Sequence, residues 1–185
     1  MLTPELRREA ERIKARYPDI RSAMLPLLYL AQSVEGHVSR EGLREVGEVL
    51  GLTTAEVESV ASFYTMIRLQ PTGRYVLSIC TNISCALNGA RALFERAREE
   101  VGPQDADVTL HEEECLGACE QAPVAQVNFL NYAKVTEQGL LDLIAALRRG
   151  EPPASTQGPV PPDFRTTCRM LAGLDPAPVP EAAGG

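Results

Sequence analysis

Residues 74–90 read RYVLSICTNISCALNGA, and this stretch decides the fold. Its first part predicts a β-strand, because Tyr75, Leu77 and Ile79 alternate with the residues between them. The strand ends on one cysteine, and a second cysteine stands just before a helix that we expect over residues 86–100. The stretch therefore predicts a strand and a helix joined by a short loop that carries two thiols.

A second stretch with two cysteines, EEECLGACEQAPV at residues 112–124, lies farther along the chain. It joins two more strand candidates, DVTLHEEE at residues 107–114 and PVAQVNF at residues 123–129. A short fourth strand, YAKVT at residues 132–136, precedes a helix that Thr136 caps. The order of strand, helix, three strands and helix, with a hairpin near the end, predicts a thioredoxin-like mixed β-sheet with flanking helices.

The chain before this sheet reads as a helical bundle. Thr3 followed by Pro4 opens one helix, and Ser39 is an N-cap candidate for another. Thr53 and Glu56 have the spacing of a capping box before the last helix. We therefore expect an α+β protein in three parts: an N-terminal helical domain over residues 1–72, a thioredoxin-like domain over residues 73–150, and a Pro-rich C-terminal tail over residues 151–185.

The expected tail holds eight of the fourteen prolines and little periodicity. Such a composition is typical of an extended or disordered segment. One piece of it, DFRTTCRML at residues 163–171, could be a short docking segment. Cys168 in this piece lies outside the two cysteine stretches, and we interpret it as a thiol without a role.

Charge and composition exclude several classes of protein. The formal net charge of −7 argues against nucleic-acid binding, which needs a basic surface, and against an anionic membrane surface. The N-terminus lacks the apolar core of a signal peptide, and no apolar run approaches the roughly 20 residues that span a bilayer. We therefore expect a cytoplasmic chain without direct membrane insertion, in which cysteines bind metal or act in redox chemistry rather than form disulfides.

The four cysteines of the two stretches are the candidate site. Cys80 and Cys85 are separated by four residues, and Cys115 and Cys119 by three. A dithiol redox site would show C-x-x-C, and a Rieske centre would need two histidine ligands where only His37, in the helical part, and His111 exist. An iron–sulfur cluster fits the small, polar surroundings best, but a structural four-cysteine zinc module for partner binding stays open on spacing alone.

These motifs resemble a known family. CTNISCALNGA followed by ECLGACEQAPVAQVN is similar to the thioredoxin-like [2Fe–2S] ferredoxin subunit of respiratory complex I, the 24-kilodalton subunit of NADH-quinone oxidoreductase and its bacterial counterpart. AMLPLLYLAQSVEGHVS and VASFYTMIRLQPTGRY, in the helical half, resemble the same family. The resemblance runs over about residues 20–150 and moves an iron–sulfur cluster well above zinc.

The resemblance implies a cofactor and partners. It implies that Cys80, Cys85, Cys115 and Cys119 ligate the iron of one [2Fe–2S] cluster. It also implies a place in the peripheral arm of a membrane-bound complex, beside a flavin- and NADH-binding subunit and a neighbouring iron–sulfur subunit. The host could instead be an NAD-linked hydrogenase or a formate dehydrogenase.

The chain itself shows no sign of a catalytic site. No G-x-G-x-x-G follows a strand and no P-loop lysine motif is present, so we expect FMN and NADH on the partner subunit only. We therefore expect an electron-carrying subunit of an oxidoreductase with no catalytic residue of its own. Phe63, Tyr64 and Met66 read as core residues more readily than as a surface for a partner.

Overall fold

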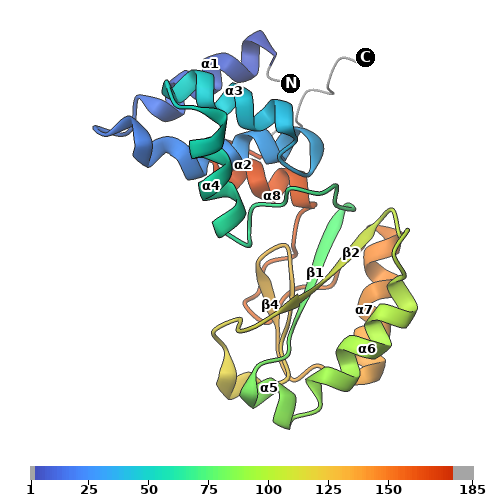
Figure 1. Ribbon diagram of the computed structural model, residues 1–185. Coiled ribbons are helices and arrows are strands. Elements are labelled where there is room, and N and C mark those ends of the chain that lie inside the picture. The colour runs from blue at the N-terminus through green and yellow to red at the C-terminus, as the bar shows by residue number, and fades with distance from the viewer. Residues whose placement is uncertain (1–2, 177–185) are drawn as a thin grey trace. The chain divides into compact units, whose positions relative to one another are not determined.

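The computed structural model describes residues 3–176, which divide into two compact units. One unit combines residues 3–71 with residues 164–176, and the other comprises Thr72–Asp163 (Figure 1). The first unit is helical, and the second is built on a sheet. The α+β class and the thioredoxin-like sheet expected from the sequence are thus both present.

Three helices of the helical unit begin at the predicted caps. Its elements are α1 (Pro4–Lys14), the 3-10 helix η1 (Ile20–Ala23), α2 (Met24–Glu35), α3 (Arg40–Leu50), α4 (Thr54–Phe63) and α8 (Phe164–Leu171). The side chains of Thr3 and Ser39 accept hydrogen bonds from backbone N–H groups of α1 and α3. Thr53 and Glu56 form the complete capping box before α4. These short polar residues satisfy N–H groups that have no partner inside the helix, which is why each helix starts there.

Helix α2 is the centre of this unit. It packs against α1, α3, α4 and α8. Nine of its twelve residues are buried, including the polar side chains of Gln32 and Ser33. A helix surrounded on all sides needs no polar face, which explains why its sequence, MLPLLYLAQSVE, is apolar almost throughout.

Helix α8 lies in the segment where the sequence predicted an extended or disordered tail. Phe164, Cys168 and Ala172 are buried, and α8 packs on α2. Gln32 Nε2 lies 3.2 Å from Cys168 Sγ. Eight residues are too short to give a strong periodic signal beside so many prolines, and tertiary packing rather than local propensity forms this helix. Cys168 is therefore a packing residue of the helical unit.

The exposed end of α4 corrects a second expectation. Phe63 is 77% exposed, and Tyr64 and Met66 are each 36% exposed, so these residues are not core. The rings of Phe63 and Tyr64 contact each other edge to face at 5.2 Å between centroids. Phe63, two residues after the buried Ala61, lies on another face of α4, and the chain leaves the helix at Tyr64, whose backbone is extended.

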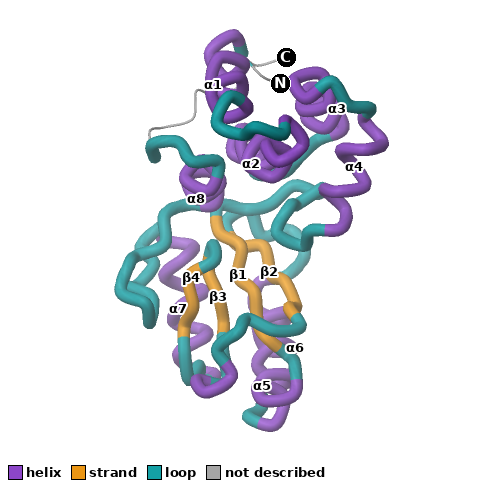
Figure 2. The backbone as a smooth tube through the Cα atoms, turned by 90° about the vertical axis from the view of Figure 1, so that its left-hand side faces the viewer, coloured by secondary structure: helices purple, strands orange, loops and turns teal. Residues whose placement is uncertain are grey.

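The second unit holds a four-stranded mixed sheet. Its strands are β1 (Tyr75–Cys80), β2 (Val108–Glu113), β3 (Ala125–Val127) and β4 (Leu130–Tyr132), in the order β2-β1-β3-β4 (Figure 2). β1 pairs with β2 in parallel and with β3 antiparallel, and β3 and β4 form the predicted hairpin. The remaining elements are α5 (Ile83–Leu87), α6 (Ala90–Val101), the 3-10 turn η2 (Cys119–Gln121) and α7 (Glu137–Arg149).

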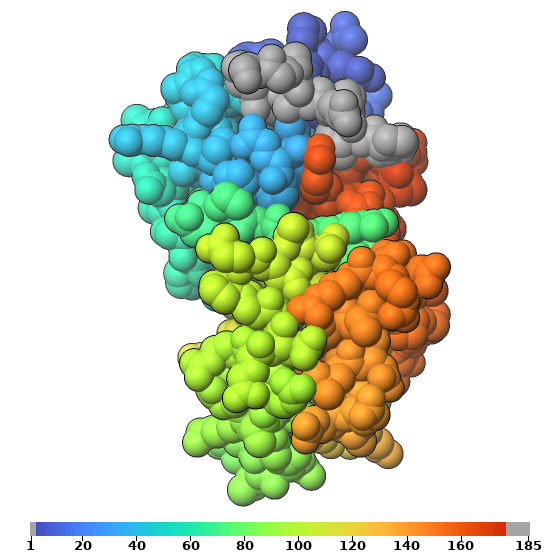
Figure 3. All heavy atoms as spheres, turned by 90° about the vertical axis from the view of Figure 1, so that its right-hand side faces the viewer, coloured from blue at the N-terminus to red at the C-terminus, as the bar shows by residue number. Residues whose placement is uncertain are grey.

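Helices α6 and α7 lie side by side (Figure 3). Together with the sheet they enclose the core of this unit. Tyr75, Leu77 and Ile79 of β1 face this core, as their alternation predicts. The opposite face of β1 is buried as well, because Val76, Ser78 and Cys80 are each less than 5% exposed. The other buried core residues come from both helices and from strands β2 and β3: Ala97, Val101, Val108, Ala125, Val127, Leu140, Leu143, Ile144 and Leu147.

Two local differences from the predicted elements affect this unit. The helix expected over residues 86–100 is split, because Gly89 has a φ of 86° that ends α5 and starts α6. The fourth strand lies at Leu130–Tyr132 rather than at residues 132–136. The two hairpin residues, Asn128 and Phe129, both have positive φ, the condition of a type I′ turn, but a phenylalanine there is not a recognisable turn signal.

Asn128 explains how this hairpin forms without a glycine. Its side-chain Oδ1 accepts from the N–H of Val76 at 2.8 Å, and its Nδ2 donates to the carbonyl of Pro162 at 2.7 Å. Its own N–H donates to the carbonyl of Val76 at 3.1 Å. These three bonds hold Asn128 in the left-handed region that Asn tolerates better than most residues.

Asp105 lies in the loop before β2 and gives this unit a predicted pH dependence. Burial alone would raise its pKa. Hydrogen bonds from the N–H of Val108, from Arg148 and from the N–H of Asp107, each 2.9 Å long, outweigh burial and hold the pKa of Asp105 below its ordinary value of 3.8. A carboxyl group with a lowered folded pKa stabilises the fold above its unfolded pKa, and this contribution is lost as the pH falls through the folded pKa.

We expect the Asp105→Asn variant to unfold at lower urea concentration than the wild-type chain at pH 7. The gap should narrow as the pH falls below about 4, because protonation then removes the advantage of the wild-type carboxylate. Urea unfolding of both proteins, followed by circular dichroism at several pH values, measures the gap. A gap of constant size down to about pH 3 would contradict this role of Asp105.

Candidate metal centre

The two loops that carry the four cysteines meet at one edge of the sheet. Cys80 is the last residue of β1, and Cys115 follows closely after the end of β2. Because β1 and β2 are parallel, with Cys80 opposite Glu113, both strands end at the same edge. Helix α5 and turn η2 then carry Cys85 and Cys119. The structure thus brings all four predicted site residues to one small hollow, which they line with Leu116, Gly117, Ala118 and Val124.

The four thiols have different environments. Cys80 and Cys85 are 4% and 2% exposed and pack with Ala90 and Val124, whereas Cys115 and Cys119 are exposed. Burial, followed by a hydrogen bond with Cys80, raises the pKa of Cys85 to about 11. A hydrogen bond with Cys115 raises the pKa of Cys119 above its ordinary value. Metal ligation needs thiolates, so binding at this hollow is expected to release protons.

Backbone groups fix the two loops around the hollow. The N–H of Cys80 donates to the carbonyl of Val124 at 3.1 Å, and the N–H of Thr81 donates to the carbonyl of Glu113 at 3.0 Å. The N–H of Gly117 lies 3.4 Å from Cys115 Sγ, and it can donate to this sulfur. Gly117 has a φ of 70°, which suits a glycine. Such N–H groups stabilise the charge on metal-bound sulfur.

Helix α5 corrects the expected position of Cys85. The sequence placed Cys85 just before a helix expected over residues 86–100. In the structure Cys85 lies inside α5, whose N-cap is Asn82, with its side chain bonded to the N–H of Ile83 at 2.7 Å. The side chain of Ser84 hydrogen-bonds Cys119 across the two loops. The sequence analysis did not identify Ser84 as a residue of the site. Its position next to Cys85 was the only signal that could have done so.

The donors fit a metal centre of the thiolate type. Among the described residues, no carboxylate or imidazole lines the hollow. His111 lies in β2 and its ring nitrogen is 3.9 Å from a carboxylate oxygen of Glu113. Within residues 3–176, no three His, Cys, Asp or Glu side chains already form a metal-binding group, so the fit rests on the type of donor and on the shared hollow. Four thiolates suit both zinc and a [2Fe–2S] cluster.

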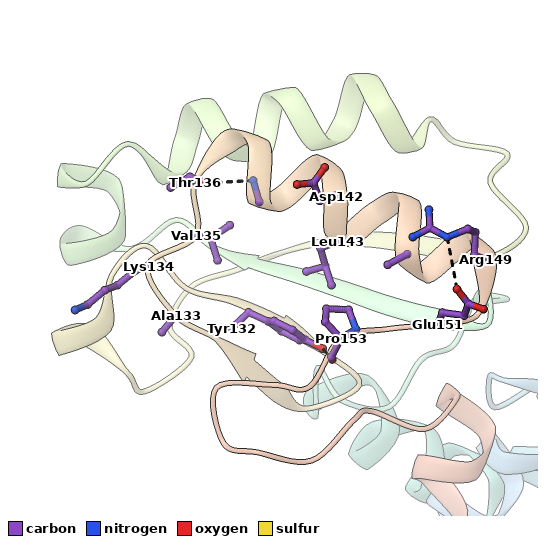
Figure 4. Close-up of a pocket in the computed structure, with 12 residues that line it drawn as sticks. Tyr132, Ala133, Lys134, Val135, Thr136, Asp142, Leu143, Arg149, Glu151 and Pro153 are labelled. Atoms are coloured by element: carbon purple, nitrogen blue, oxygen red, sulfur yellow. Dashed lines mark hydrogen bonds and ion pairs between the residues drawn. The ribbon is translucent and has the colours of Figure 1, made fainter.

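Another pocket of this unit holds no thiol. It has a volume of about 490 Å³ and lies between α7, the end of β4 and the chain that follows α7 (Figure 4). Lys134, Asp142, Arg149 and Glu151 bring charges of both signs to its lining, and Arg149 pairs with Glu151 at 3.8 Å. The pocket thus differs in chemistry from the cysteine hollow.

The sheet and its four thiols define a thiolate metal protein with a thioredoxin-like fold. The family model of the thioredoxin-like [2Fe–2S] ferredoxins matches residues 10–148. The chain belongs to this family. The family decides between the two metals left open by the donors: the cofactor is a [2Fe–2S] cluster, and the zinc module is not favoured.

Relatives with curated names are similar over most of the chain. A subunit of NADH-quinone oxidoreductase from Mycobacterium tuberculosis is 44% identical over 183 residues, covering 96% of this chain and 73% of the relative. A subunit of the oxidoreductase of the same name from Thermus thermophilus is 40% identical over 146 residues, covering 74% and 81%. The similarity to the first relative extends beyond the sheet unit into both helical segments.

A solved structure confirms the fold. An NAD⁺-reducing [NiFe]-hydrogenase in the air-oxidized state matches 70% of this chain with a TM-score of 0.61 and 23% sequence identity. The match covers 23% of the hydrogenase chain. The likeness is therefore one of fold.

Proposed function

We propose that this chain is an electron-transfer subunit of the NADH dehydrogenase module of complex I, NADH-quinone oxidoreductase. The observation that carries the proposal is the convergence of four thiols on one hollow, in a chain of the [2Fe–2S] ferredoxin family. The names of relatives 44% and 40% identical to this chain support the host complex.

We assign Cys80, Cys85, Cys115 and Cys119 as the ligands of one [2Fe–2S] cluster. The buried pair would hold the inner side of the cluster, and the exposed pair would hold the side nearer the solvent. When bound, the cluster supplies one-electron redox chemistry. The N–H of Gly117 is placed to stabilise sulfur charge, and the bonds of Cys80 and Thr81 keep the loops together.

The electron partners belong to the same proposal. We assign FMN and NADH to a partner subunit, which exchanges electrons with the cluster, and we place a second iron–sulfur subunit nearby. This arrangement locates the chain on the cytoplasmic side, in the peripheral arm of the complex. Among residues 3–176, no helix is both long enough and apolar enough to span a bilayer. In this role the chain makes or breaks no bonds of the substrate.

A hydrogenase is the second candidate for the host complex. The likeness to the NAD⁺-reducing hydrogenase favours it, but at 23% identity that likeness concerns the fold alone. The identity of 44% over 96% of the chain favours the quinone-linked complex. The proteins that co-purify with the native chain would decide between the two hosts.

The first experiment is an anaerobic absorption spectrum of the purified chain, with iron, sulfide and zinc analysis. We expect visible bands that bleach on dithionite reduction and a rhombic low-temperature EPR signal whose mean g value is below that of the free electron. A colourless protein with stoichiometric zinc and no iron after anaerobic preparation would overturn the proposed function.

A further inference from the structure

The two edges of the sheet differ in charge. Strand β2 lies at one edge and carries Glu112 and Glu113, and charged side chains on an edge strand discourage pairing with another strand. Strand β4 lies at the other edge. Residues 121–133, which contain β3, β4 and the turn between them, include no Asp, Glu, Lys, Arg or His. The edge at β4 therefore has no protection by charge.

A proline-rich segment, residues 152–162, lies along the edge at β4, and we call it the strap. The N–H of Asn131 donates to Gln157 Oε1 at 3.2 Å, and the carbonyl of Asn131 accepts from the N–H of Thr156 at 2.9 Å. The N–H of Ala133 donates to Thr156 Oγ1 at 2.8 Å. Both backbone groups of Asn131 thus point away from β3, and the strap satisfies them.

The strap is held in place and ends the sheet. The hydroxyl of Tyr132 donates to the carbonyl of Pro153 at 2.7 Å near one end of the strap (Figure 4). Asn128 Nδ2 donates to the carbonyl of Pro162 at its other end. Five of the eleven strap residues are prolines, which have no N–H to donate to a further strand. The strap therefore covers β4 without offering a new ladder of donors in its place.

We propose that β4 is a latent site for strand addition, which the strap keeps closed, and that the partner it fits is β4 of a second copy of this chain. Without the strap, two β4 strands can pair antiparallel, with Asn131 opposite Asn131. Because both backbone groups of Asn131 face outward, the two residues would exchange two N–H···O bonds, as in the hydrogen-bonded pair of an antiparallel ladder. The same surface on both copies would form the contact, which is the condition for a closed dimer.

The lack of charge favours a second copy as the occupant of this edge. Two β4 strands bring no like charges together, because residues 121–133 carry none. The same pairing at the opposite edge would bring Glu112 and Glu113 of two copies together, and like charges directly opposite each other destabilise a strand pair. The strap is thus the feature that keeps a self-complementary edge from pairing with itself.

The test measures the mass of the full chain with its cluster by sedimentation over a range of protein concentrations. We expect the wild-type chain to stay monomeric. The Thr156→Pro/Gln157→Ala variant loses all three bonds to β4, and we expect it to become mostly dimeric at concentrations where the wild-type chain is a monomer. The Val160→Thr variant is the matched control and should stay monomeric, because Val160 lies in the strap, is 55% exposed and makes none of these three bonds.

A further substitution identifies the surface through which the copies meet. Asn131→Lys, added to the strap variant, places two like charges opposite each other in the β4 pair, so we expect it to restore the monomer. A strap variant that stays monomeric at every concentration would overturn the latent edge. A dimer that persists with Asn131→Lys, or that forms equally in Val160→Thr, would overturn it as well. If the strap variant loses its visible spectrum, Thr156→Val/Gln157→Leu makes the same comparison, since it removes only the two side-chain bonds.

Discussion

Replacement of any one of Cys80, Cys85, Cys115 or Cys119 by alanine is expected to abolish the [2Fe–2S] spectrum. Each alanine removes one of the four thiols that line the hollow, and the described lining offers no carboxylate or imidazole to take its place. Loss of a group that merely orients a ligand already costs about 10–100-fold in metal affinity, so loss of the ligand should cost at least that much. Visible absorbance and iron per chain, after anaerobic preparation, measure the loss.

Cys168→Ala is the control for this series. Cys168 is fully buried, but it lies in α8 of the helical unit and contacts Gln32 rather than the hollow. We expect this variant to keep its iron and its spectrum, with at most a lower melting temperature. Full iron occupancy in the Cys85→Ala variant, or iron loss in Cys168→Ala, would show that the ligand set is assigned wrongly.

The alanine variants of the buried and the exposed cysteines should differ in the stability of the fold once the cluster is absent. Cys80 and Cys85 also pack with Ala90 and Val124, so their alanine variants lose packing as well as a ligand. Cys115 and Cys119 are exposed and contribute little packing. This difference follows from the fold, in which strand β1 and helix α5 place one pair inside and the long loop after β2 places the other pair at the surface.

Much of this fold could be predicted from the sequence, because it depends on interactions between residues close together in the chain. Thr3, Ser39 and Thr53 mark three helix starts because their side chains satisfy backbone N–H groups within the same turn. The convergence of the cysteines follows from the topology of the sheet, because a crossover between parallel strands brings both strand ends to the same edge. The spacing of the cysteines alone did not choose the metal.

The features that the sequence did not predict depend on distant contacts. The hairpin at Asn128 is held by Val76 and by the carbonyl of Pro162, which lie far away in the chain. Helix α8 forms against α2, more than one hundred residues earlier. The break at Gly89 makes α5 a separate helix, so that Cys85 lies inside a helix and not before one. None of these contacts has a local signature.

The Arg169→Met variant is expected to destabilise the helical unit strongly. Arg169 of α8 makes two bonds to the carboxylate of Glu9 in α1, at 2.9 and 2.5 Å, and its Nε donates to the carbonyl of Asp175 at 2.9 Å. The two side chains of the ion pair are only 8% and 12% exposed. Removing one member leaves a buried carboxylate without its partner, and such a loss costs about 3–5 kcal/mol.

A second substitution distinguishes the cost of an unpaired charge from the loss of packing. In the Glu9→Leu/Arg169→Met variant both charges are replaced by apolar groups, and we expect most of the lost stability to return, because an apolar pair needs no desolvation of charges. Arg44→Met is the exposed control: Arg44 pairs with Glu41 and Glu48 at the surface of α3, where solvent weakens ion pairs, so its unfolding midpoint should hardly change. Urea unfolding of the four proteins gives the comparison. Equal destabilisation in the single and double variants would mean that Arg169 acts through its packing on α1 and not through its charge.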